Sequence, residues 1–259
     1  MKRIERQKYL NDLISLRENG MIKVITGMRR CGKSYLLFEI FSSYLESNGV
    51  KIDHVIKIDL EDYKNKSLRN PNNLYEYVEN RITDDDVYYI LLDEVQMLDN
   101  FVDVLNGFLK KQNVDIYVTG SNAKFLSKDV ITEFRGRGFE IRIYPLSFSE
   151  YMSAYSGTIQ SGINEYMLYG GLPQILSYKT EEHKTTFLKS LFEETYIKDI
   201  KERYNIKKDD DLEELISQKS KLLILLHGKI RLWQKKTCSV NHIRQLILKP
   251  YIIRLVQYS

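Results

Sequence analysis

The chain has 259 residues, of which 43% are hydrophobic and 29% are charged, as in an ordinary globular protein with one large core and a smaller second one. The charged start argues against a signal peptide, and the longest aliphatic run, Leu222–Leu226, is too short to span a bilayer; we expect a cytoplasmic protein with no membrane partner. Two cysteines exclude a disulfide framework, and the histidines lack ligand spacing, so we expect structural or surface roles for His54, His183, His227 and His242.

The first elements are a short helix, a strand and a glycine-rich loop. Apolar residues at positions 9, 10, 13 and 14 predict a helix that packs under the sheet, with a place under a nucleotide base as the alternative. The β-branched run 21–26 predicts a buried strand. Residues 27–34 then read G-x-x-x-x-G-K-S, and an amphipathic helix follows as far as Asn48-Gly49.

This order predicts a site for a nucleoside triphosphate. Gly27 and Gly32 let backbone N–H groups turn toward phosphate oxygens, and Lys33 reaches the β- and γ-phosphates. Ser34 opens the helix and offers its hydroxyl to Mg²⁺. Cys31 is expected to be a small filler and not a redox switch. The residues assigned to the nucleotide are Gly27, Arg29, Arg30, Cys31, Gly32, Lys33, Ser34 and Tyr35.

A second strand and an acidic strand end follow. We expect a strand over 50–60, a helix opened by Pro71 that runs to Ile82, and a turn at 84–86. The apolar run 87–92 ends in Asp93-Glu94, as a Walker B element does. Asp93 would hold Mg²⁺ through its water shell, and Glu94 would orient or polarise the attacking water. The alternative is a buried strand capped by a solvated acidic turn.

Further on, residues 101–109 predict an amphipathic helix and 114–119 another strand. Strands that alternate with helices indicate an α/β fold with a mainly parallel sheet and helices on both faces. Ser121 and Asn122 stand where a sensor side chain would reach the attacking water or the γ-phosphate. A plain turn with an N-cap for a helix at Ala123 explains the same residues.

Two arginines lie between glycines before a last predicted strand, 140–144. Arg135 and Arg137 would suit phosphate contact in cis or an arginine finger in trans, because a planar guanidinium neutralises charge on a transferring phosphoryl group. A loop that merely faces solvent is the alternative. A finger in trans would require at least a homodimer.

The last part of the chain differs in charge. Residues 215–259 hold nine Lys or Arg and no Asp or Glu. This basic tail would suit contact with the phosphate backbone of DNA, or it is a basic, poorly folded extension.

Taken together, six segments resemble a large set of prokaryotic AAA-type ATPases whose C-terminal domain has no assigned function. The resemblance covers about residues 1–214. It implies a P-loop NTPase (AAA+-like) core of five parallel strands followed by a small helical lid, with ATP as the nucleotide and Arg135 or Arg137 as the charge-neutralising arginine. The segments are 22–34, 91–96, 118–122, 135–137, 144–148 and 169–173.

The expected organisation is a P-loop ATPase core with its N-terminal helix at 1–146, a helical lid or linker at 147–214 and the basic tail at 215–259. The tail does not align with the usual continuation of the family. We therefore expect a truncated or frameshifted C-terminal domain there.

The leading hypothesis is Mg²⁺-dependent ATP hydrolysis that drives a conformational change in an unidentified protein client. Without an Asn-Lys-x-Asp motif a GTPase is disfavoured, and Asp93-Glu94 favours water over a kinase acceptor. The alternatives are a nucleotide-gated DNA-binding protein with little turnover and an ATP-binding truncated relic. The expected catalytic residues are Glu94, Asn122, Arg135 and Arg137, and the expected Mg²⁺ ligands are Ser34 and Asp93.

Overall fold

The computed structural model of the chain describes residues 2–120, 134 and 136–192, all of which belong to the unit Met1–Tyr204. Its centre is a five-stranded sheet in the order β2-β3-β4-β1-β5, and every strand pair is parallel. The expected α/β fold is confirmed. The strands are β1 (Ile22–Thr26), β2 (Val55–Asp59), β3 (Tyr88–Asp93), β4 (Val114–Gly120) and β5 (Gly138–Arg142).

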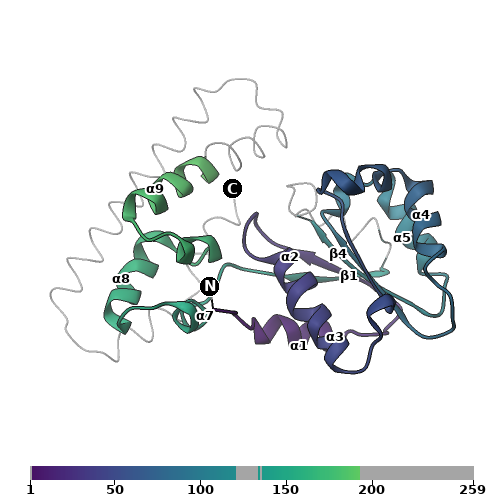
Figure 1. Cartoon of the computed structure of the whole chain (residues 1–259), viewed down its shortest axis with the longest axis horizontal. Coiled ribbons are helices and arrows are strands. Elements are labelled where there is room, and N and C mark those ends of the chain that lie inside the picture. Colours follow the sequence, from purple (N-terminus) through teal and green to yellow (C-terminus); the bar gives the residue numbers. More distant parts are fainter. Residues whose placement is uncertain (1, 121–133, 135, 193–259) are drawn as a thin grey trace, which may run out of the picture. The chain divides into compact units, whose positions relative to one another are not determined.

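Helices cover both faces of the sheet (Figure 1). Side chains of β3 alternate between the faces: Tyr88, Ile90 and Leu92 join one hydrophobic cluster, and Tyr89 and Leu91 join the other. The first cluster includes α4 (Pro71–Glu79) and α5 (Phe101–Phe108), and the second includes α1 (Gln7–Ser15), η1 (Leu36–Phe41) and α3 (Ser42–Ser47). The N-terminal helix therefore packs against the sheet, as favoured from the sequence. Short helical turns connect these elements: α2 (Lys33–Tyr35), η2 (Ile52–His54), η3 (Tyr63–Arg69) and η4 (Val95–Met97).

Three predicted boundaries were wrong. The strand expected over 50–60 begins at Val55, because Ile52–His54 form the helical turn η2 and the parallel pairing with β3 begins at Val55. The strand expected over 140–144 occupies 138–142, because it pairs with β1, which ends where the chain turns into the glycine-rich loop. The helix opened by Pro71 ends at Glu79.

A helical segment, residues 148–192, follows the sheet. It contains α7 (Phe148–Ala154), α8 (Ile159–Tyr169), η5 (Pro173–Ser177) and α9 (Glu181–Ser190). Glu165 of α8 accepts hydrogen bonds from Tyr151 of α7 and from Lys184 of α9, so one carboxylate joins the three helices. The pKa of Glu165 is lowered by these bonds against its burial.

Gly171 fixes where this segment meets the sheet domain. The N–H of Leu146 donates to the carbonyl of Gly171 at 2.7 Å, and a Cβ on Gly171 would lie 2.2 Å from the carbonyl oxygen of Leu146. Only a glycine allows the two backbones to come this close.

Candidate functional site

A pocket of about 580 Å³ opens beside the loop that follows β1. In a parallel sheet, ligands bind beyond the carboxyl ends of the strands, and this is the edge where β1 and β3 end. The pocket is lined by residues from the N-terminal segment, the glycine-rich loop, the turns after β2 and β3, the connection before α7 and the turn η5. They are Lys2, Ile4, Arg6, Arg29, Arg30, Cys31, Gly32, Lys33, Ser34, Tyr35, Glu61, Glu94, Leu146, Pro173 and Gln174.

The loop has glycine at positions 27 and 32 for two different reasons. Gly27 has φ 151°, and a Cβ there would lie 2.4 Å from the carbonyl oxygen of Ile143. Gly32 has φ 99° and is the N-cap of α2; a Cβ there would make only an ordinary contact, 3.9 Å from Pro173. Close packing therefore requires glycine at position 27, and backbone conformation favours it at position 32.

Lys33 crosses the loop. Its side chain is 4% exposed, and Nζ donates to the carbonyl oxygens of Gly27 at 3.1 Å and Met28 at 3.2 Å. These bonds hold the ammonium on the inner side of the loop. A cation in this position can meet an anionic group that enters the loop.

Asp93 ends β3 and is buried beside the loop. Its carboxylate accepts hydrogen bonds from the hydroxyls of Thr119 and Ser34. Burial, together with the nearby carboxylates of Glu94 and Asp59, raises the pKa of Asp93 above the ordinary aspartate value, although the two hydrogen bonds lower it. Ser34, which follows Lys33 in α2, is thus hydrogen-bonded directly to Asp93, the last residue of β3. A hydroxyl and a carboxylate oxygen are the hard ligands that Mg²⁺ prefers, so the pair fits this ion.

Glu94 adopts a left-handed backbone conformation, with φ 52°. This turn directs the chain away from β3, and Glu94 lines the pocket. Its N–H donates to Thr119 Oγ1 at 3.0 Å, and its carboxylate accepts from the amide of Gln96. Asp93 and Glu94 therefore differ in both burial and partners, as the alternation of strand side chains implies.

Thr119 is a site residue that the sequence analysis missed. Its single hydroxyl donates to the Asp93 carboxylate and accepts from the Glu94 N–H. Residues 92 and 118 face each other in the parallel register, which places Thr119 beside Asp93. A hydroxyl near the end of a buried strand was the available signal, but the strand order was needed to connect it to β3.

The tip of the loop contacts the helical segment. The guanidinium of Arg30 lies 5.5 Å from the ring centre of Phe187 in α9, and Met28 packs against Leu172, Ile175 and Leu191. Cys31 is fully buried, and burial raises the pKa of its thiol. A neutral, inaccessible thiol fits the expected filler role. Arg29 and Tyr35 both line the pocket.

Of the predicted arginine and sensor residues, Arg137 lies within the part of the chain that the structure describes, and it does not line the pocket. Arg137 precedes β5 at the opposite edge of the sheet, where its carbonyl accepts from Ile22 N–H and its guanidinium donates to Asn106 at 3.3 Å. This location disfavours phosphate contact in cis and leaves the role in trans a prediction. Asn122 and Arg135 lie outside the described residues.

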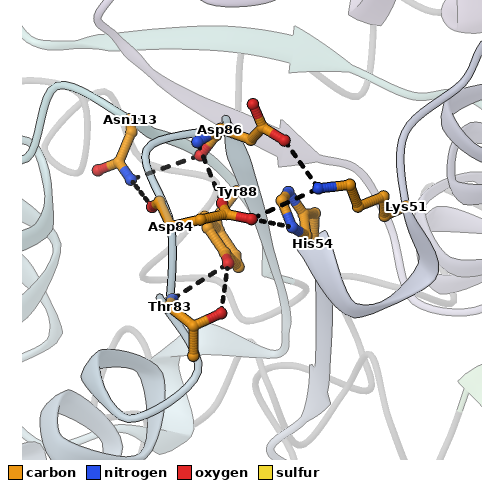
Figure 2. A network of polar contacts seen from close by, with 7 residues as sticks. All are labelled: Lys51, His54, Thr83, Asp84, Asp86, Tyr88 and Asn113. Atoms are coloured by element: carbon orange, nitrogen blue, oxygen red, sulfur yellow. Dashed lines mark hydrogen bonds and ion pairs between the residues drawn. The ribbon is translucent and has the colours of Figure 1, made fainter.

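A polar network at that opposite edge contains His54, Asp84 and Asp86, which lie within 4.8 Å of one another (Figure 2). His54 is buried, stacks on Tyr88 and lies 3.3 Å from Asp84. Lys51 places its ammonium 3.4 Å from Asp84 and 2.9 Å from Asp86. The network joins the loops before β2 and β3. Because the ammonium of Lys51 already neutralises charge on both carboxylates, we do not assign the network to a metal.

The glycine-rich loop follows the central strand β1, and Asp93 ends β3, which β4 separates from β1. This order of parallel strands defines a P-loop nucleotide-binding domain of the AAA+ class. The chain belongs to the AAA domain family, whose model matches residues 19–152. It therefore carries an AAA-type ATPase domain, and the resemblance stated from the sequence is confirmed. A second family model, a domain of unknown function, matches residues 160–223.

Two relatives span the same region. An uncharacterized protein of Haemophilus influenzae is 32% identical over 219 residues, 82% of this chain and 54% of the relative. One from Methanocaldococcus jannaschii is 30% identical over 216 residues, 75% of this chain and 45% of the relative. The chain spans about half the length of these relatives.

Among solved structures, PCH-2 of C. elegans is 16% identical, with a TM-score of 0.42 over 63% of this chain and 46% of that protein. Within residues 2–120, 134 and 136–192, no helix has the length and apolar character needed to cross a membrane.

Proposed function

We propose that the chain binds ATP with Mg²⁺, hydrolyses it and uses the reaction to drive a conformational change in a partner protein. The observation that carries the proposal is that Lys33, Ser34 and Glu94 line one pocket and that Asp93 is hydrogen-bonded to Ser34 beside it. Their spacing in the sequence supports the same reaction class.

In this proposal each side chain has a separate task. Lys33 exchanges its bonds to loop carbonyls for contacts with phosphate oxygens. Ser34 and Asp93 hold Mg²⁺, which when bound neutralises charge on the phosphates. Glu94 orients the attacking water from its position on the pocket wall.

Two further roles are part of the proposal. Asn122 would act as the sensor, and Arg135 or Arg137 would stabilise the transition state. Because Arg137 lies at the opposite edge of the sheet, its guanidinium would serve the site of another copy of the chain, which makes a homo-oligomer part of the proposal.

A second candidate function rests on the charge of residues 215–259. The tail carries nine basic and no acidic residues, which favours a nucleotide-gated DNA-binding protein with little turnover. Tight ATP binding without hydrolysis in the wild-type chain, with DNA affinity that falls steeply as salt is raised, would favour this candidate. The third alternative, an ATP-binding relic, would bind ATP without hydrolysing it and would have no affinity for DNA.

The test is steady-state ATP hydrolysis by the full chain and by Glu94→Gln, with and without DNA, beside ATP affinity. We expect the variant to lose roughly 100-fold or more in kcat while its ATP affinity stays within about threefold, because the carboxylate acts on water in the transition state. Glu76→Gln, the same change on the exposed side of α4, is the matched control. Equal turnover in wild type and Glu94→Gln would sink the proposal.

A further inference from the structure

The helix α8 carries a row of apolar side chains on its solvent-exposed side. Ile159, Ile163 and Met167 follow one another at four-residue spacing, which places them on one side of the helix. These three residues are 68%, 38% and 62% exposed. The solvent side of a surface helix normally carries polar and charged residues. A contiguous exposed apolar surface is instead typical of an interaction site.

The other side of α8 already packs against its neighbours in the chain. Gly162 is buried there, and a Cβ at this position would clash with the sulfur of Met152 in α7. Glu165, on the same side, accepts a hydrogen bond from Lys184 of α9. These contacts with α7 and α9 fix the rotation of α8 about its axis, so the apolar row faces outward.

The lack of charge around the row limits the partners that it can take. Glu165 is the one charged residue of α8, and it is turned toward Lys184. Gln160 and Asn164, which flank the row and are exposed, carry neutral amides that both donate and accept hydrogen bonds. The row therefore offers no counter-charge to a strongly charged partner. In a two-fold pair of helices, a charged group near the axis would face its own copy, and a neutral row avoids this repulsion.

The row is also symmetric about its centre. Ile159 lies four residues before Ile163, and Met167 lies four residues after it. When two such helices pack antiparallel around a two-fold axis at Ile163, this residue meets its own copy. Ile159 of each copy then meets Met167 of the other, so every apolar residue of the row has an apolar partner.

We propose that two copies of the chain associate through this row, as an antiparallel pair of α8 helices. The proposal does not rest on ATP hydrolysis, and a chain without turnover could still form the pair. Three side chains on one helix make a small interface. The dimer should therefore be weak, with a dissociation constant on the order of 10 µM.

The experiment is sedimentation velocity of the full chain over a range of concentrations, with wild type, Ile163→Glu, Ile163→Lys and an equimolar mixture of the two variants. Wild type should dimerise as its concentration rises. Each variant alone should associate at least roughly tenfold more weakly, because like charges then face each other at the axis, and the mixture should recover association, because opposite charges do.

Recovery in the mixture would also show that both variants fold, since an unfolded variant could not restore a specific dimer. Wild type that stays monomeric well above the expected dissociation constant overturns the proposal. So do single variants that associate as strongly as wild type, because the copies would then meet elsewhere, and a mixture that associates no better than its components.

A second measurement locates the contact by cross-linking. The parent is Cys238→Ser, which leaves the buried Cys31 in place. In this parent, Ile163→Cys should form an inter-chain disulfide under mild oxidation, because the two copies of this position meet at the axis. Ser161→Cys is the matched control, since Ser161 is exposed on the same helix but lies about 160° around it from Ile163. Equal disulfide yields for the two positions, or none at position 163, would contradict the proposed pairing.

Discussion

Thr119 joins both residues at the end of β3 through one hydroxyl group. It donates to the carboxylate of Asp93 and accepts from the N–H of Glu94. Glu94 has a left-handed backbone conformation, which residues other than glycine rarely adopt. The hydroxyl therefore holds both the proposed metal ligand, Asp93, and the peptide of Glu94, whose carboxylate we propose to orient water. It touches neither ATP nor water in the proposal, so it is a positioning residue.

We predict that Thr119→Val lowers kcat by roughly 10- to 100-fold with a much smaller change in KM, because the Cβ branching and volume remain while both bonds are lost. Thr119→Ser, which keeps the hydroxyl, should restore most of the activity. Steady-state kinetics on the three proteins measures this. If Ser and Val variants are equally impaired, packing of the methyl group, and not the hydroxyl, is what matters.

At the scale of elements, the helical segment depends on Glu165, which joins α7, α8 and α9. Because the pKa of Glu165 in the folded state is lowered below its ordinary value of 4.5, the stabilising contribution of Glu165 is complete above that value. It is lost as pH falls through the lower folded-state pKa, since the protonated carboxyl no longer pairs with Lys184.

We predict that Glu165→Gln is less stable than wild type at pH 7 and that the difference shrinks as the pH falls from 6 to below 4. Urea unfolding at a series of pH values measures it. Glu182→Gln, an exposed carboxylate at the start of α9, should show no such convergence. A difference between wild type and Glu165→Gln that stays constant over this range would contradict the prediction.

Elements made of contiguous residues could be predicted from the sequence. The glycine-rich loop and the apolar strand before Asp93 each contain their own evidence, and the structure has both at the expected positions. Strand ends were less predictable, because the end of β5 depends on β1, which is distant in the sequence.

Residues whose roles depend on the register or on long-range packing could not be identified in this way. Thr119 acquires its partners from the pairing of β3 with β4, and Arg6 meets Tyr144 from 138 positions away. His54 likewise finds Asp84 through the loops before β2 and β3. Gly171 belongs to a recognisable sequence motif, but the need for a glycine at this position became clear only from its close contact with Leu146.

At the scale of the whole described unit, the loop that would hold phosphate is also a packing surface for α9. Arg30 lies over the ring of Phe187, and Met28 contacts the cluster around Ile175. A nucleotide that changes the conformation of the loop must therefore change the contacts of α9.

We predict that ATP slows amide hydrogen exchange in residues 173–190 of wild type and that Phe187→Ala weakens this effect, because it removes a cation–π contact of roughly 0.5–1 kcal/mol and adjacent packing. Leu168→Ala truncates a 68% exposed side chain of α8 and is the control. An ATP effect of the same size in Phe187→Ala would show that the loop and α9 respond independently.

This shared surface has a thermodynamic consequence that works in both directions. If a bound nucleotide changes the free energy of displacing α9, then a molecule that binds by displacing α9 changes the free energy of nucleotide binding by the same amount. A partner that displaces the helical segment would thus change how tightly the nucleotide binds. Met28 and Arg30, at the tip of the loop, would carry this coupling, because they contact the helical segment on one side and belong to the nucleotide-binding loop on the other.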